Sequence, residues 1–243
     1  MRVTKDDLTR ETADKQAVSA KTSSSSDVSA FVERVQALSH LRNKAEAKGR
    51  LIFSLDATLS RQPTWDMACH LQAEMFDVVD HQGGLEVQLN YFRGFGECRS
   101  SKWVGDGAKL RGFMGRIRCQ GGRTQIKKVF ANARREHKRQ AIDALVFIGD
   151  AMEENVDVLC SKAGELGMLG VPLFIFQEGR DATVERAFRE FARLTKGAYA
   201  RFDQSSAEEL ASLLRSVAVY ATGGLKALEA SGERLLLEQM SGR

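Results

Sequence analysis

The sequence lacks most of the features that mark disulfide-rich or zinc-binding proteins. Its 243 residues include four cysteines, Cys69, Cys98, Cys119 and Cys160, and no two of them form a C-x-x-C pair. Cysteines that are few and far apart, in a chain without a secretory signal, predict reduced thiols. A zinc site built from the usual paired cysteines is not expected.

Long apolar segments are missing as well. No run approaches the roughly twenty apolar residues of a membrane span, and the N-terminal "MRVTKDDLTRETADKQ" has no apolar core. That core is what a secretory signal requires. We therefore expect no membrane partner and a cytoplasmic location. The stretch "GDGAKLRG" (105–112) contains glycines but no G-x-G-x-x-G, so a dinucleotide site is not indicated.

Charge is distributed unevenly along the chain. The net charge is +4, but the segment from Arg99 to Arg139 contains thirteen Lys or Arg and two acidic residues, a local excess of +11. One face of the protein is therefore expected to be basic and another acidic. A solvated helix face is the default interpretation, and an acidic partner for residues 99–139 is the alternative. Nucleic-acid binding is less favoured, because aromatic residues are not interleaved with the cations.

The two ends of the chain differ in composition from its centre. Residues 1–28 are polar, balanced in charge and end in "KTSSSSD", a composition that predicts a disordered tail. Apolar residues at three- and four-residue spacing predict a helical extension over 29–49. One domain is expected over 50–222, followed by a C-terminal helix or tail over 223–243.

Strands and helices alternate along the expected domain. The strands in 50–56, 143–150 and 171–177 are almost continuously apolar, which is typical of parallel strands covered on both faces by helices. The other expected elements are strands at 85–92, 100–105 and 198–202, helices at 64–81, 109–117, 124–140, 155–169, 183–197 and 206–222, and an amphipathic segment at 225–240. This order predicts a doubly wound, mostly parallel α/β sheet with helices on both faces, in addition to the N-terminal helix.

Oxygen-bearing side chains follow two of the apolar strands. Asp56, Thr58 and Ser60 come at the end of "LIFSLDATLS", and Asp150 ends "ALVFIGD". Ligands of doubly wound sheets bind at the carboxyl ends of the strands. The four side chains could meet there with Thr124, which begins a predicted helix after the glycine pair of "CQGGRT". Two carboxylates and three hydroxyls form a hard oxygen set, suited to Mg²⁺ or Mn²⁺ rather than zinc.

In their order along the chain, these fragments resemble the metal-ion-dependent adhesion site (MIDAS) of the von Willebrand factor type A (VWA) domain family, over roughly residues 50–205. The family motif is D-x-S-x-S, then a threonine in a glycine-led loop, then an aspartate after an apolar strand. The resemblance implies that Thr58, Ser60 and Thr124 bind a metal ion through their hydroxyls. It implies that Asp56 and Asp150 act mainly through bound water.

The same resemblance implies a protein-interaction module and not an enzyme. An open position on the metal would accept an Asp or Glu side chain of a partner protein. The sequence departs from the family pattern at two positions. Thr58 replaces a serine but keeps its hydroxyl, and Ala151 stands where the family usually has glycine.

Two alternatives remain open. The first is a haloacid-dehalogenase-like, Mg²⁺-dependent phosphatase with Asp56 as nucleophile and with Asp150 and Glu154 as metal anchors. Against it, Thr58 stands where such enzymes have a general-acid aspartate. The second is a metal-free scaffold of the same fold, in which the residues after the first strand serve only as turn formers and helix caps.

Overall fold

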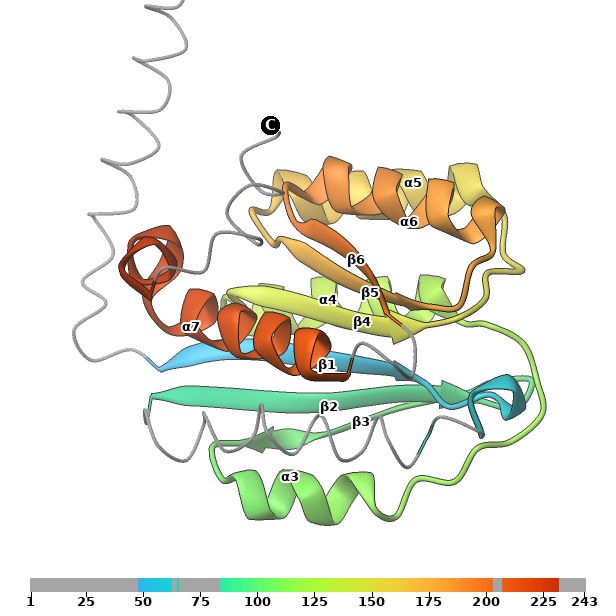
Figure 1. Ribbon diagram of the computed structural model, residues 1–243, viewed down its shortest axis with the longest axis horizontal. Coiled ribbons are helices and arrows are strands. Elements are labelled where there is room, and N and C mark those ends of the chain that lie inside the picture. Colours follow the sequence, from blue (N-terminus) through green and yellow to red (C-terminus); the bar gives the residue numbers. More distant parts are fainter. Residues whose placement is uncertain (1–47, 63–64, 66–83, 203–206, 232–243) are drawn as a thin grey trace, which may run out of the picture. The chain divides into compact units, whose positions relative to one another are not determined.

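A computed structural model describes residues 48–62, 65, 84–202 and 207–231 of the protein (Figure 1). The chain divides into two units, Met1–Asn43 and Lys44–Arg243, and every described residue belongs to the second. The predicted tail, the predicted N-terminal helix and nearly all of the predicted helix 64–81 lie outside the described residues. So does the end of the C-terminal segment.

The described part of the chain forms a six-stranded sheet in the order β3-β2-β1-β4-β5-β6. Neighbouring strands are parallel, except that β2 and β3 are antiparallel. The strands are β1 (Gly49–Asp56), β2 (Leu85–Arg93), β3 (Glu97–Val104), β4 (Ala144–Gly149), β5 (Leu173–Glu178) and β6 (Ala198–Phe202). The predicted doubly wound, mostly parallel sheet is confirmed. Strand β3 begins earlier than the predicted 100–105, because it pairs with β2 across a short turn.

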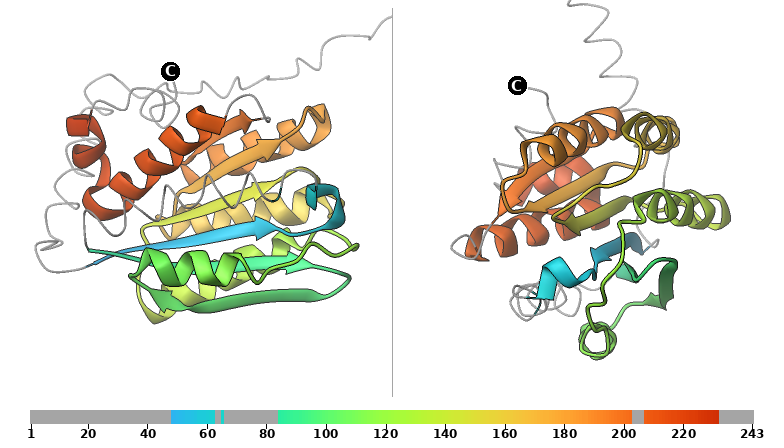
Figure 2. Two further views of the ribbon diagram at one scale, coloured as in Figure 1. Left: turned by 60° about the horizontal axis from the view of Figure 1, so that its bottom comes forward. Right: turned by 90° about the vertical axis from the view of Figure 1, so that its right-hand side faces the viewer.

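Helices cover both faces of the sheet (Figure 2). One face is covered by α4, α5 and α6, and the other by α3 and α7. The helices are α3 (Gly107–Met114), α4 (Ile126–Arg139), α5 (Val156–Met168), α6 (Ala182–Thr195) and α7 (Ala207–Ser231), together with a short 3-10 helix, η1 (Leu59–Arg61).

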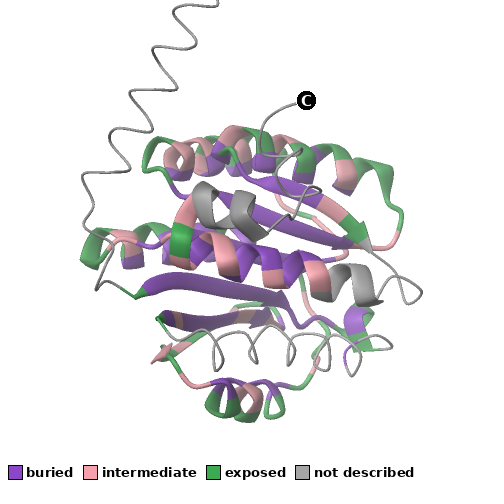
Figure 3. Cartoon of the chain, turned by 60° about the vertical axis from the view of Figure 1, so that its left-hand side comes forward, coloured by how far each residue is buried: buried purple, intermediate pink, exposed green. Residues whose placement is uncertain are grey.

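Strand β1 is buried along its whole length (Figure 3). Leu51, Phe53 and Leu55 belong to the core under α3 and α7, and Ile52 belongs to the core under α4, α5 and α6. Successive side chains of a strand point to opposite faces of the sheet. A strand covered on both faces therefore needs apolar residues at almost every position, as β1 has between Leu51 and Leu55, where only Ser54 is polar.

Two helices differ from the predictions. α4 begins at Ile126, so Thr124 lies in the preceding loop and does not begin the helix, which is a correction to the predicted bounds. α7 runs through both predicted C-terminal segments, 206–222 and the described part of 225–240, with an interruption at Gly224. The φ of Gly224 is 69°, a left-handed conformation that glycine adopts without steric penalty.

Disulfide bonds and membrane-spanning helices are the two features that the sequence did not predict. Cys98, Cys119 and Cys160 form no disulfide with one another, and Cys69 lies outside the described residues. No helix in the described part of the chain is both long and apolar enough to cross a membrane.

Candidate metal centre

The winding of the sheet reverses between β1 and β4. From β1 the chain moves outward to β2 and β3, and then crosses back to β4 on the other side of β1. Such a switch point opens a crevice at the carboxyl edge of a parallel sheet, where ligands bind. Asp56 ends β1 and Asp150 directly follows β4. Leu55 is paired with Ile148, so the chain leaves the sheet at adjacent positions on the two strands.

Gly149 ends β4 close to the ring of Phe147 and to Asp56. A Cβ atom at Gly149 would lie 3.4 Å from the Cβ atom of Asp56 and 2.9 Å from the ring of Phe147. A side chain at this position would therefore push against the ring of Phe147, whereas its contact with Asp56 would be an ordinary one.

Only one of the two carboxylate oxygens of Asp56 accepts a hydrogen bond from the described residues. The residue is fully buried, and its Oδ1 atom accepts a hydrogen bond of 2.8 Å from the backbone N–H of Thr58. Its Oδ2 atom is buried and has no hydrogen-bond partner among the described residues. The same holds for Oδ1 of Asp150. Unpartnered buried carboxylate oxygens are unfavourable, because a charge taken out of water needs compensation.

Electrostatics at Asp56 reflect this arrangement. Burial and, to a smaller extent, the nearby negative charge of Asp150 raise the pKa of Asp56 from 3.8 to about 7. The hydrogen bonds from Thr58 and the positive charge of Arg61 act in the opposite direction. A cation between the two carboxylates would favour the ionised form of Asp56.

The two hydroxyls after β1 lie together. Oγ1 of Thr58 and Oγ of Ser60 are 3.0 Å apart. Their loop is anchored on both sides: the N–H of Ala57 donates to the carbonyl of Phe92, and the N–H of Gln120 donates to the carbonyl of Ala57. The loop that leaves β1 is thus held between β2 and the segment that leads to α4.

The glycine pair before Thr124 is explained by a close backbone approach. A Cβ atom at Gly122 would lie 2.0 Å from the carbonyl oxygen of Gly94, whereas one at Gly121 would meet nothing within 4 Å. The N–H of Arg123 donates to the same carbonyl at 3.1 Å. Only the second glycine is therefore required for the loop to pack on the turn between β2 and β3.

Thr124 is held by the loop that follows β4. Its Oγ1 atom accepts a hydrogen bond of 3.0 Å from the N–H of Glu153, and its own N–H donates to the carboxylate of Glu153 at 2.7 Å. The carboxylate of Glu154 accepts from the N–H groups of Ile126 at 2.5 Å and Lys127 at 2.9 Å. The capping role expected of a residue before α4 thus falls to Glu154. The signal in the sequence was a pair of acids shortly after β4.

Arg61 is a further charged residue that the metal hypothesis did not include. It ends η1, immediately after Ser60, and its side chain is fully buried. It forms an ion pair with Glu178, the last residue of β5. The only signal in the sequence was a cation directly behind the D-x-T-x-S stretch.

The side chains at this edge carry the oxygen atoms that a hard divalent cation binds. Asp56, Thr58 and Ser60 share one hydrogen-bonded turn, Asp150 lies at the neighbouring strand end, and Thr124 is held by the loop after β4. Within the described ranges, no group of three or more His, Cys, Asp or Glu could hold a metal ion. A cation here would therefore depend on hydroxyl oxygens and water, which Mg²⁺ accepts readily.

Comparison with solved structures identifies the fold. The chain is similar to a von Willebrand factor type A protein from Catenulispora acidiphila, with a TM-score of 0.60 and 17% identity over 73% of this chain and 43% of that one. The chain has a VWA fold. The VWA domain of SpRpn10 is also similar, with a TM-score of 0.58 and 12% identity over 69% of this chain and 95% of that domain.

A third structure with this fold contains a metal. Proximal thread matrix protein 1 from the mussel byssus, solved with a zinc-occupied MIDAS motif, has a TM-score of 0.55 and 16% identity over 72% of this chain and 46% of that one. The chain spans less than half of this protein and of the Catenulispora protein. No family model and no curated protein matches the sequence. At these identities the VWA likeness concerns the fold alone.

Proposed function

We propose that the chain is a metal-dependent protein-interaction module. Mg²⁺ or Mn²⁺ is held by the hydroxyls of Thr58, Ser60 and Thr124, with Asp56 and Asp150 acting mainly through bound water. The bound cation supplies an electrophilic position for the carboxylate of an Asp or Glu on a partner protein. The chain's own loops hold the hydroxyls in place and give the site its specificity.

One observation carries this proposal. At the switch point of the sheet, Oδ2 of Asp56 and Oδ1 of Asp150 are buried and have no partner among the described residues. Two such oxygens on adjacent strands concentrate negative charge, and burial together with the charge of Asp150 raises the pKa of Asp56. A divalent cation at the switch point offsets this charge, and neutral hydroxyls around it leave the metal able to accept a further carboxylate.

The phosphatase alternative receives less support. It requires Glu154 as a metal anchor, but both carboxylate oxygens of Glu154 accept hydrogen bonds from the backbone of α4. It also requires a proton donor where the chain has Thr58, and the pKa of a threonine hydroxyl is far too high for general-acid catalysis near pH 7. An interaction module needs neither group.

Isothermal titration calorimetry with MgCl₂ and MnCl₂ tests the proposal. We expect the full chain to bind one divalent cation. Asp56→Asn keeps the shape of the side chain but removes its charge, and Ser60→Ala removes one hydroxyl. Each is expected to weaken binding about tenfold or more. The matched control is Asp106→Asn, which removes a carboxylate from the N-cap of α3 after the antiparallel strand β3, and it should leave the affinity unchanged.

The outcomes separate the three hypotheses. If neither metal binds the wild-type chain, the metal-free scaffold replaces the proposal. Turnover of a generic phosphate ester that disappears in Asp56→Asn would instead establish the phosphatase. Binding of metal without turnover, with loss in Asp56→Asn and Ser60→Ala but not in Asp106→Asn, supports the interaction module.

A further inference from the structure

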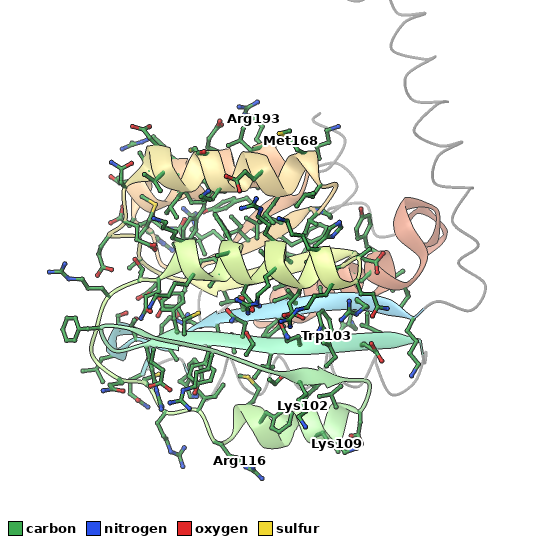
Figure 4. The ribbon with its side chains drawn as sticks, turned by 180° about the vertical axis from the view of Figure 1, so that it is seen from behind. Lys102, Trp103, Lys109, Arg116, Met168 and Arg193 are labelled. Atoms are coloured by element: carbon green, nitrogen blue, oxygen red, sulfur yellow. The ribbon has the colours of Figure 1, made fainter. Side chains whose placement is uncertain are left out.

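The outward side of α4 forms a basic face, defined as Lys127, Lys128, Arg134, Arg135, Lys138 and Arg139. All six side chains are exposed, while the opposite side of the helix packs into the core. The one acidic residue of the helix, Glu136, is buried and accepts a hydrogen bond of 3.1 Å from Nε1 of Trp103. Figure 4 looks onto this side of the molecule, with α4 lying in front of the sheet beside α5.

A hollow lies within the basic face. Its volume is about 400 Å³, and it is lined by Ala131, Arg134, Arg135, Lys138 and Arg139. Four cations therefore surround one small apolar residue. A hollow of this composition presents positive charge at its rim to an anionic group, and the small side chain of Ala131 leaves room for that group.

Nearby acids neutralise only part of this charge. Arg134 pairs with Glu165 of α5 at 3.2 Å, and Arg139 pairs with the buried Glu136 at 3.2 Å. The ammonium group of Lys128 donates to neutral oxygens, the carbonyl of Gly96 and the side chain of Gln125. Among the described residues, these two acids thus serve six cations, Glu136 also lying 3.7 Å from Arg135, and the basic face keeps a net positive charge.

The distribution of these cations favours the helix only in part, because Lys138 and Arg139 in the last turn suit the helix dipole. Arg134 and Lys138, like Arg135 and Arg139, are four residues apart, where equal charges repel. Lys127 lies in the first turn, which contains no acidic residue, although the helix dipole disfavours cations there. The stability of the helix therefore accounts for the cations of its last turn but not for Lys127 or for the repelling pairs.

The basic face begins at the candidate metal centre. α4 starts two residues after Thr124, and its first N–H groups are bound to Glu154 of the loop that also holds Thr124. Lys127 therefore lies at the metal end of the helix and Arg139 at the far end. The 14 residues of α4 span about 21 Å.

We propose that the basic face binds an acidic segment of a partner protein, leading away from the metal-bound carboxylate. The link to the metal rests on the proposed function, while the binding of acidic residues by α4 does not. An extended segment of about six or seven residues covers the length of the helix. The carboxylates of this segment pair with the exposed cations, so binding is strong at low ionic strength and weakens with salt.

A protein segment fits this surface better than a nucleic acid. Single strands bind by stacking their bases on aromatic side chains, and the basic face as defined has none. Trp103, beside α4, is already engaged, because it donates to Glu136 and its ring lies 3.8 Å beneath the guanidinium of Arg50. The chain as a whole also has a net charge of only +4.

Fluorescence anisotropy with a labelled peptide of about eight consecutive glutamates, long enough to span α4, tests the inference on the full chain. Titrations are run at low and high salt, each in Mg²⁺ and in EDTA. The test variant is Arg135→Gln/Lys138→Gln/Arg139→Gln. The matched control removes the same charge from the exposed side of α6: Arg186→Gln/Arg189→Gln/Arg193→Gln. Circular dichroism and a urea midpoint confirm that both variants fold.

We expect the α4 variant to weaken peptide binding about tenfold or more at low salt, in Mg²⁺ and in EDTA alike, and the α6 control to change it less than about twofold. Equal affinities for the α4 variant and the α6 control would overturn the inference. It would also be overturned if a labelled RNA or DNA duplex bound more tightly than the peptide and lost that binding in the α4 variant.

Metal dependence separates this inference from the proposed function. If EDTA and Asp56→Asn leave peptide binding unchanged while the α4 variant abolishes it, the basic face stands and metal bridging fails. If EDTA abolishes binding while the α4 variant behaves as wild type, metal bridging stands and the basic face fails. Loss of binding in both supports one continuous binding surface.

Discussion

The buried guanidinium of Arg61 forms an ion pair with the carboxylate of Glu178 at the carboxyl edge of the sheet. Arg61 directly follows Ser60, and Glu178 ends β5. In the sheet, β4 lies between β1 and β5, so the pair connects the loop after β1 with a strand that is not its neighbour. The loop that carries Thr58 and Ser60 is thereby held in place by the ion pair with Glu178 as well as by its own hydrogen bonds.

We expect Glu178→Gln to lower the free energy of unfolding by about 3 kcal/mol, because it removes the carboxylate that compensates a buried cation. Urea denaturation measures the change. The double variant Arg61→Met/Glu178→Leu should recover most of the loss, since it removes both charges. Glu190→Gln, which breaks the exposed pair with Arg193, is the control and should cost less than about 1 kcal/mol. Equal losses in Glu178→Gln and Glu190→Gln would contradict this account.

Alanine at Gly122 should destabilise the protein, whereas alanine at the neighbouring Gly121 should have almost no effect. Gly122→Ala places a Cβ atom against the carbonyl of Gly94, so we expect a loss of about 2 kcal/mol in stability and weaker Mg²⁺ binding as Thr124 is displaced. Gly121→Ala meets open space and should leave both nearly unchanged. Urea denaturation and calorimetry on the two variants measure the difference. The close approach is not required if Gly122→Ala binds metal and unfolds like Gly121→Ala.

Glu154 is expected to stabilise the start of α4. Its carboxylate satisfies the N–H groups of Ile126 and Lys127, and Glu154→Ala leaves both without this partner, which should cost about 1–2 kcal/mol. Hydrogen exchange at these two amides should accelerate, while exchange in α5 stays the same. Asp157→Ala, in the first turn of α5, serves as control with an expected loss of about 0.5 kcal/mol. Unchanged exchange at Ile126 in Glu154→Ala would rule out the cap.

Tyr220 should make the protein less stable in alkaline solution. It lies in α7, its ring meets that of Phe174 edge-on at 5.5 Å, and burial raises its pKa from 10.0 to about 12. In the unfolded chain the phenol loses its proton near pH 10, whereas the folded chain keeps it to about pH 12. The stability is therefore fully present below pH 10 and is lost as the pH rises through this range, by up to about 3 kcal/mol.

Urea midpoints of the wild type and Tyr220→Phe between pH 8 and about pH 12, the folded-state pKa, measure this effect. The phenylalanine variant retains the packing but has no proton to lose, so its stability should decline less steeply above pH 10. The other tyrosines titrate equally in both proteins and cancel from the comparison. Identical pH profiles for the two proteins would show that Tyr220 does not contribute.

The architecture could be predicted because its signals are local. The strands β1, β4 and β5 are apolar at nearly every position, since each is covered on both faces, and this pattern is visible without knowledge of any partner. The alternation of such strands with helices leaves a doubly wound sheet as the natural arrangement. The same topology places Asp56 and Asp150 at one edge, so their proximity also followed from the sequence.

The details of the candidate site could not be predicted in this way. Thr124 was expected to begin α4, but it lies before the helix and is bound by Glu153, 29 residues further along the chain. The glycine pair was recognised, but only the structure distinguishes Gly122, where an added Cβ atom would meet Gly94, from Gly121, where it would meet nothing within 4 Å. Each of these facts depends on a partner that the local sequence does not identify.

The sequence by itself determined which strands are covered on both faces, the D-x-T-x-S turn after β1 and the concentration of positive charge between Arg99 and Arg139. Only the tertiary structure decided which oxygens remain unpartnered, which acid caps α4 and which carboxylate compensates Arg61. Periodicity and composition are properties of neighbouring residues, whereas the energy of a buried charge or hydrogen bond is set by whatever the fold brings into contact with it.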